Sequence, residues 1–153
     1  MPSASASVRL AYFSPQRVFA ESVDGKSATA KLTALQAEKA KEIESRTARL
    51  QSQREALQRS ATVLDPTARA AREREIERFQ LDLQRFTEDA QAEFLGVQRT
   101  VEQTFLGRLR LAVDRVAKDR QLLLVFDADA GPLFWSDPSV DITSDIVASL
   151  NAQ

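Results

Sequence analysis

The chain of 153 residues contains no cysteine and no histidine. Without these two residue types it can form no disulfide and no zinc site of the usual kind. It also lacks thiol nucleophiles and the commonest general base of enzymes. We therefore predict that the protein is not an enzyme and that it binds no metal and no cofactor. The absence of cysteine fits both the cytoplasm and an oxidising compartment, so it does not decide the localisation.

Long apolar runs and an excess of positive charge are also missing. No apolar run approaches the roughly 18–20 residues that a membrane-spanning helix needs. The chain has 21 Lys and Arg against 22 Asp and Glu, so its net charge of −1 provides no overall basic field to recruit nucleic acid. The length corresponds to a single domain without room for a second large core. We predict no nucleic-acid partner.

Glycine and proline are scarce between residues 26 and 121, where the composition is rich in Ala, Leu, Glu, Gln, Lys and Arg. This composition is typical of helices, and the one break is at Asp65 and Pro66, a capping residue followed by a proline suited to the first helical position. The pattern predicts an antiparallel hairpin with helices over 26–63 and 66–120 and its tip near 64–67. At a rise of about 1.5 Å per residue, helices of about 57 and 80 Å must project as an arm.

Four phenylalanines lie on one stripe of the second predicted helix: Phe79, Phe86, Phe94 and Phe105. Such a stripe ordinarily packs against the partner helix. The first helix, however, is apolar on one thin line only, formed by Ile43, Leu50, Leu57 and Leu64. We predict that the stripe packs mainly inside the hairpin and that part of it offers weak apolar contact to a guest.

The charges are unevenly distributed along the chain. Residues 46–72 carry a net charge of +4, whereas residues 122–153 hold five aspartates and no basic residue. The basic run is either a solvated helix face or a surface for phosphate, lipid headgroups or acidic segments of a partner. Its position near the hairpin tip is compatible with a weak contact to an anionic membrane surface. Its arginines are Arg46, Arg49, Arg54, Arg59, Arg69 and Arg72.

The two ends of the chain carry strand patterns. Residues 1–25 are predicted to form a disordered lead, a strand over 8–13, and a short helix that Ser14 caps and Gly25 ends. Residues 121–153 are predicted to form strands over 122–126, fully buried, and over 133–135, followed by a terminal helix over 144–150 capped by Thr143.

Three strands as short as these cannot make a stable sheet alone. They nevertheless hold the densest apolar residues, so we predict that several chains pool their strands in one body and that the protein is an obligate oligomer. The predicted oligomerisation residues are Val8, Leu10, Tyr12, Leu122, Leu124, Phe126, Phe134 and Trp135. The predicted fold class is α+β, mostly α.

Asp127 and Asp129 form the one paired-carboxylate motif in a plausible loop. A divalent cation needs several oxygen ligands, and no nucleophile, lysine or phosphate-cradling glycine loop accompanies the pair. The alternative is that the two side chains organise a turn by accepting hydrogen bonds from local amides, with Gly131 free to take a positive φ. We favour the turn over a metal site.

The C-terminal block, LLLVFDADAGPLFWSDPSVDITSDIVASLN (122–151), resembles the Skp/OmpH family of periplasmic chaperones. The family's pattern joins a hydrophobic strand, a D-A-x-A-G turn and an S-D-P-S-x-D-I-T-x-D segment. RLAYFSPQRVF (9–19) matches the N-terminal strand and helix of the family more loosely. The residues that fit the C-terminal pattern are Asp127, Ala128, Ala130, Gly131, Asp137, Pro138, Asp141, Ile142, Thr143 and Asp145.

The resemblance implies a homotrimer in which a β-body built from all three chains carries three helical arms around a central cavity. Family members hold unfolded outer-membrane proteins in that cavity and prevent their aggregation without ATP. It also implies a periplasmic protein, although the given sequence starts without a complete signal peptide. The predicted client-binding residues are the arginines of 46–72 with Phe79 and Phe86. The alternative is a structural coiled-coil adaptor that binds a folded partner.

Overall fold

The computed structural model describes residues 9–152, which fall into two compact units. The first unit, called the body, comprises the residues up to Ala30 and from Arg99 onward; the second, called the arm, comprises residues 31–98. The elements follow in the order β1, α1, α2, α3, β2, the 3-10 turn η1 and α4. The predicted disordered lead over 1–7 and the strand residue Val8 lie outside the described residues.

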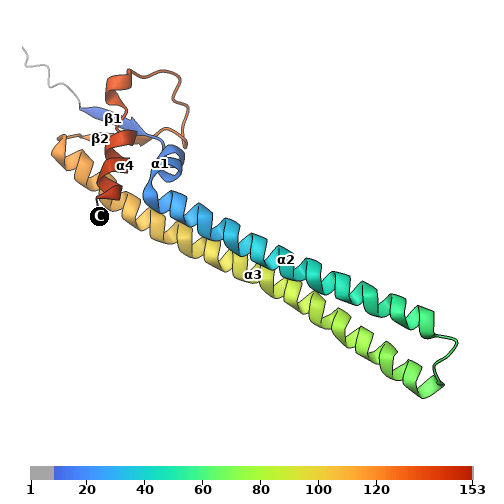
Figure 1. Ribbon diagram of the computed structural model, residues 1–153. Helices are drawn as coiled ribbons and strands as arrows, with labels where there is room; N and C mark the ends of the chain where they lie inside the picture. The colour runs from blue at the N-terminus through green and yellow to red at the C-terminus, as the bar shows by residue number, and fades with distance from the viewer. Residues whose placement is uncertain (1–8, 153) are drawn as a thin grey trace, which may run out of the picture. The chain divides into compact units, whose positions relative to one another are not determined.

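The sheet of the body pairs β1 (Leu10–Phe13) with β2 (Leu124–Asp127) in parallel, as Figure 1 shows. Parallel neighbours need a long crossover, and here the whole stretch from α1 to α3 provides it. The strand predicted over 133–135 is wrong, because that segment has no regular structure in the chain. The amide of Leu133 donates to the carbonyl of Gly131 at 2.9 Å, so the backbone turns locally instead of pairing with a strand.

Helix α1 (Pro15–Glu21) begins as the sequence predicts, because the side chain of Ser14 accepts a hydrogen bond from the amide of Arg17. The predicted stop at Gly25 is wrong. Helix α2 (Val23–Ser60) already starts at residue 23 and contains Gly25 in its first turn. A Cβ at this position would lie 1.7 Å from the carbonyl oxygen of Phe19, so the glycine permits a close approach of the two helices.

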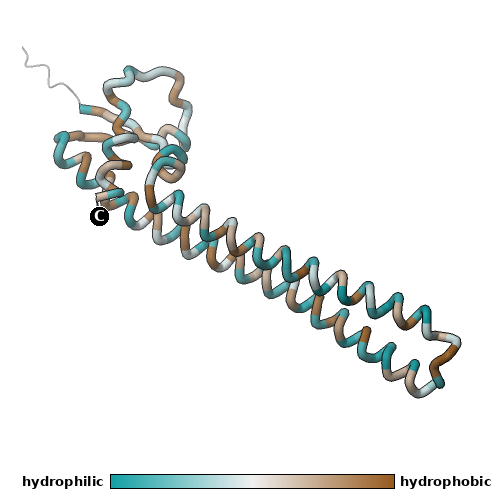
Figure 2. Tube along the Cα trace, in the orientation of Figure 1, coloured by the Kyte–Doolittle hydropathy of each residue, from teal (hydrophilic) through white to brown (hydrophobic). Residues whose placement is uncertain are grey.

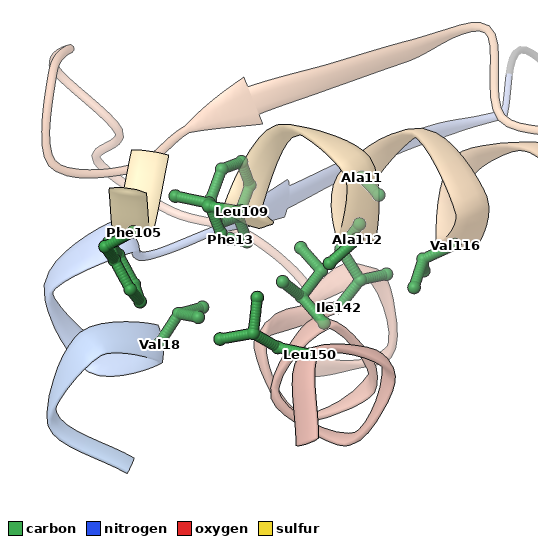
Figure 3. Packing of buried hydrophobic residues seen from close by; sticks show 10 residues of the cluster. Ala11, Phe13, Val18, Phe105, Leu109, Ala112, Val116, Ile142 and Leu150 are labelled. Carbon is green, nitrogen blue, oxygen red and sulfur yellow. The ribbon is translucent and has the colours of Figure 1, made fainter. Parts of the chain in front are cut away.

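In the core of the body, side chains of β1, α1 and the start and length of α4 pack around one stretch of α3, as Figure 3 shows. Along β1, Ala11 and Phe13 are buried, while Leu10 and Tyr12 face outward, as the two-residue period of a strand requires. Phe19 packs edge-on against Phe105 with 4.9 Å between ring centroids. The cluster consists of Ala11, Phe13, Val18, Phe105, Leu109, Ala112, Val116, Ile142, Ile146 and Leu150.

Helix α4 (Thr143–Asn151) closes the body after η1 (Pro138–Val140). The prediction that Thr143 caps this helix is wrong, because Thr143 is its first helical residue and its hydroxyl makes other bonds. The amide of Ser14 donates to that hydroxyl at 3.2 Å, and the hydroxyl donates to Asp141. Asp141 also accepts from the amide of Thr143. The side chain that bonds to an amide at the start of α4 is therefore that of Asp141, two residues before the predicted cap.

The arm consists of parts of α2 and of α3 (Pro66–Asp119), which run antiparallel within residues 31–98 (Figure 1). The side chain of Asp65 accepts hydrogen bonds from the amides of Thr67 and Ala68, as predicted for a cap at the tip. Helix α2 begins and ends three residues earlier than the predicted 26–63. Helix α3 ends one residue earlier than the predicted 66–120. Figure 2 shows mostly hydrophilic residues along the arm with scattered hydrophobic ones.

Candidate functional site

Two phenylalanines of the aromatic stripe, Phe79 and Phe86, lie under cations of the opposite helix. The guanidinium carbon of Arg46 lies 4.1 Å from the ring centroid of Phe86, and that of Arg49 lies 5.1 Å from the ring of Phe79. Arg46 is held in place because its Nε donates to Glu42 at 2.7 Å. A cation over a ring face is attracted by the ring quadrupole, so these pairs join α2 to α3 where apolar partners are few. Two of the predicted client-binding arginines therefore contact the two predicted client-binding phenylalanines.

The other predicted arginines are spread along the arm and form no common site. Arg54 donates to Gln80 on the opposite helix at 2.6 Å, and Arg69 pairs with Glu73 at 3.0 Å within α3. Arg59 lies in the last turn of α2, where a cation is favoured by the helix dipole. Arg72 lines a hollow of about 300 Å³ with Gln53, Ala56, Glu75 and Ile76.

A second hollow in the arm, here called the notch, was not foreseen from the sequence. It has a volume of about 280 Å³ and lies between α2 and α3. Ala40 and Ala90 face it from opposite helices, so small side chains leave a gap in the packing. The sequence contains both alanines, but it does not show that they face each other. The notch is lined by Gln36, Lys39, Ala40, Ile43, Thr87, Ala90, Gln91 and Phe94.

Lys39 is the charged residue that lines the notch. Its ammonium group pairs with Glu93 on α3 at 2.8 Å and lies 5.7 Å from the ring centroid of Phe86. The hydrogen bond to Glu93 raises the pKa of Lys39. The notch therefore has mainly apolar walls, and its one charged lining residue is held by an ion pair with Glu93, which lies outside the lining.

Four of the predicted oligomerisation residues of the body lie on the outward face of the sheet. Leu10 pairs with Leu124 and Tyr12 with Phe126, so the four side chains share the face opposite the core. The prediction that β2 is fully buried is wrong for the single chain, because Leu124 is 56% and Phe126 52% exposed. Phe134 and Trp135, in the loop after β2, are even more exposed. Leu122, by contrast, packs against the core.

A groove of about 520 Å³ also opens in the body along α3. Its walls are mainly apolar, and Leu106, which is largely exposed, lies among them. None of the predicted site residues lines this groove, which is formed by Phe13, Gln103, Leu106, Gly107, Leu109, Arg110 and Val113. Within residues 9–152, no helix is both long and apolar enough to cross a membrane.

Comparison with known proteins places the chain in a family. A family model described as outer membrane protein (OmpH-like) matches residues 9–150. The chain belongs to the OmpH-like family. The resemblance predicted from the C-terminal block is thereby confirmed.

A solved structure supports the same fold for this OmpH-like protein. The crystal structure of a proposed outer membrane chaperone (OmpH-like) from Caulobacter crescentus superimposes with a TM-score of 0.86. The match covers 94% of this chain and 83% of that chain at 21% sequence identity. A search among curated proteins gives no significant match.

Asp127, which belongs to the pattern of the resemblance, and the nearby Asp129 are hydrogen-bonded acceptors in the OmpH-like body. Asp127 accepts from the amides of Asp129 and Ala130, as expected of a turn. The prediction that the side chain of Asp129 bonds to local amides is wrong, because this carboxylate reaches the start of α1, where it accepts from the hydroxyl of Ser14 and the amide of Gln16, both at 2.9 Å. Gly131 has no positive φ, contrary to expectation. In the described part of the chain, no three acidic side chains are grouped as a metal ion would require.

The next two aspartates of the block have perturbed acidities. Burial alone would raise the pKa of Asp141, but hydrogen bonds from Thr143 and the nearby Arg17 outweigh it and lower that pKa. Hydrogen bonds from Ser139 lower the pKa of Asp137. The ion pair between Arg17 and Asp141 measures 3.0 Å. Asp137 is therefore an ionised cap of η1, and Asp141 is an ionised acceptor that joins the start of α4 to Arg17 of α1.

Proposed function

We propose that this OmpH-like protein is an ATP-independent holdase chaperone that binds unfolded outer-membrane proteins and prevents their aggregation. The observation that carries the proposal is the composition of the arm. Its helices are joined by cations on aromatic rings, and hollows remain where apolar partners are missing. Membership of the family and the chaperone described for the similar structure support the same function.

The arm suits a guest that has no fixed shape. Leu81 and Leu95 are largely exposed along α3, and arginines lie between them and the tip. Scattered apolar and cationic contacts are individually weak and favour no single geometry. A guest bound in this way can fluctuate and leave, so release requires no nucleotide-driven step.

We further propose that the protein acts in the periplasm as a homotrimer. The outward sheet face with Leu124 and Phe126, together with Trp135, is an apolar surface of the kind that oligomers bury. Copies of the same chain, each exposing these residues, would cover one another. Light scattering coupled to gel filtration should give three times the 17.0 kDa of one chain. A monomer would contradict the pooled body.

The function is tested with a urea-unfolded outer-membrane porin diluted into buffer with and without the purified protein. We expect lower turbidity and a soluble complex of porin and chaperone in gel filtration, at equal yield with and without ATP. A folded porin in place of the unfolded one is the control and should not bind. A protein that leaves aggregation unchanged and forms no complex would contradict the holdase function.

A further inference from the structure

We propose that the notch between α2 and α3 in the arm binds one aromatic side chain of an unfolded client polypeptide. This inference rests on the proposed function and names the kind of side chain that the arm recognises. The occupant is a phenylalanine, tyrosine or tryptophan ring that enters from solvent and lies against the alanines of both helices.

The size and the walls of the notch fit such a ring. Its volume of about 280 Å³ admits one large side chain, and Ile43 and Phe94 provide apolar walls. Ala90 is buried at the α2–α3 contact while Ala40 is exposed, so the notch opens to solvent beside Ala40. Burying an aromatic ring there removes apolar area from water and fills a gap in the arm.

The charge beside the notch favours an aromatic over an aliphatic occupant. Lys39 lines the notch, and Glu93 fixes its ammonium group at 2.8 Å. Lys39 and Arg46 already lie over the ring of Phe86, which shows that cations of α2 in this region are placed to meet aromatic faces. A ring in the notch would attract this ammonium group from its partly exposed ion pair with Glu93 and gain a cation–π contact in addition to apolar burial, whereas an aliphatic chain would gain burial alone.

The proposed clients are rich in the matching side chains. Strands of outer-membrane barrels alternate apolar and polar residues and carry girdles of aromatic residues at both membrane interfaces. In the unfolded state these rings are exposed to water and available for capture. The notch therefore fits the chemistry of the client class on which the proposed function depends.

Two synthetic peptides test the aromatic preference on the full-length protein. They have the same length and charge, with four phenylalanines in one and four cyclohexylalanines, which resemble phenylalanine in shape but lack the π-system, in the other. Fluorescence anisotropy should show that wild type binds the phenylalanine peptide about fivefold more tightly. In NMR spectra, the methyl signals of Ala40 and Ala90 should shift with that peptide through ring currents.

Two matched alanine variants locate the site. Ala40→Leu fills the notch from an exposed position, and we expect it to abolish the preference and weaken binding of both peptides. Ala34→Leu places the same side chain at another exposed position of α2 outside the notch and should behave as wild type. Both changes suit a helix, and circular dichroism verifies that both variants keep their helix content.

A third variant isolates the cation. Lys39→Met keeps the notch open and should bind the two peptides equally well. Retention of the preference in Lys39→Met would overturn the aromatic assignment, and retention in Ala40→Leu would overturn the site. Suppression of porin aggregation by wild type is measured in parallel. If suppression holds without any peptide preference, only the notch is refuted; if suppression itself fails, the holdase function is refuted.

Discussion

At the scale of single residues, Gly25 is the position where the body tolerates no side chain. A Cβ there would lie 1.7 Å from the carbonyl oxygen of Phe19, so Gly25→Ala must push α1 away from the first turn of α2. We expect a loss of about 2–3 kcal/mol in the free energy of unfolding, measured by urea titration. Gly107→Ala is the control, because a Cβ there meets nothing within 4 Å. It should stabilise α3 by about 0.5–1 kcal/mol. Equal stabilities of the two variants would contradict this account.

Caps could be predicted from the sequence only where both partners are local. Ser14 and Asp65 bond to amides two or three residues ahead, which spacing alone reveals. The error at Thr143 has a distant cause, because its hydroxyl bonds to the amide of Ser14, which is 129 residues away. Asp129 was correctly placed in a turn, but its bonds to the start of α1 depend on the pairing of β1 with β2 and leave no local signal.

At the scale of elements, α4 and η1 should detach in acid. The pKa values of Asp137 and Asp141 are lowered in the folded chain. The stabilisation is therefore fully present above the unfolded pKa of about 3.9 and is lost as pH falls through the lower folded values. We expect the melting temperature of the body to fall below about pH 4.

The Asp141→Asn variant tests this carboxylate. It should cost about 1–2 kcal/mol at pH 7, since charge-assisted bonds from Thr143 and Arg17 weaken. Its melting temperature should also depend less on pH between 5 and 2 than that of wild type, a window set by the unfolded pKa of about 3.9. Asp82→Asn, an exposed carboxylate of the arm, is the control and should keep the wild-type profile. A wild-type slope in Asp141→Asn would show that other groups cause the acid sensitivity.

The pairing of the arm helices leads to a further prediction. Arg46→Ala removes the guanidinium over Phe86 and should lower local stability by about 0.5–1 kcal/mol. Hydrogen exchange of amides near residues 43–50 should accelerate correspondingly. Arg69→Ala removes a salt bridge within one helix and should leave exchange in α2 unchanged. Equal effects in the two variants would exclude a cross-helix role for Arg46.

The two long helices and the break at Asp65 followed from composition, but their mode of contact did not. Periodicity counts apolar residues and treats arginine as solvated, whereas Arg46 and Arg49 here supply the surface that covers two rings. The notch was equally hidden. A gap opposite Ala40 exists only once the register of α2 against α3 is known.

At the scale of the whole molecule, sequence could not separate burial within a chain from burial between chains. Apolar density predicted a fully buried strand at 122–126 and a second short strand at 133–135, yet the single chain leaves Phe126 52% and Phe134 97% exposed. Part of this apolar segment is buried within the single chain, because Val125 packs toward the core. The exposed apolar side chains, such as Phe126, face outward, and burial between the subunits of the proposed trimer would explain them.

Phe126→Glu tests that account. The side chain points away from the core, so the variant should keep its helix content and fold as a monomer. A charge on an apolar surface buried between copies cannot be paired there, so the trimer should dissociate, and light scattering should report the mass of one chain. Leu111→Glu places the same charge on an exposed position of α3 in the body and should remain trimeric. A Phe126→Glu protein of unchanged trimeric mass would show that this sheet face lies outside the interface between subunits.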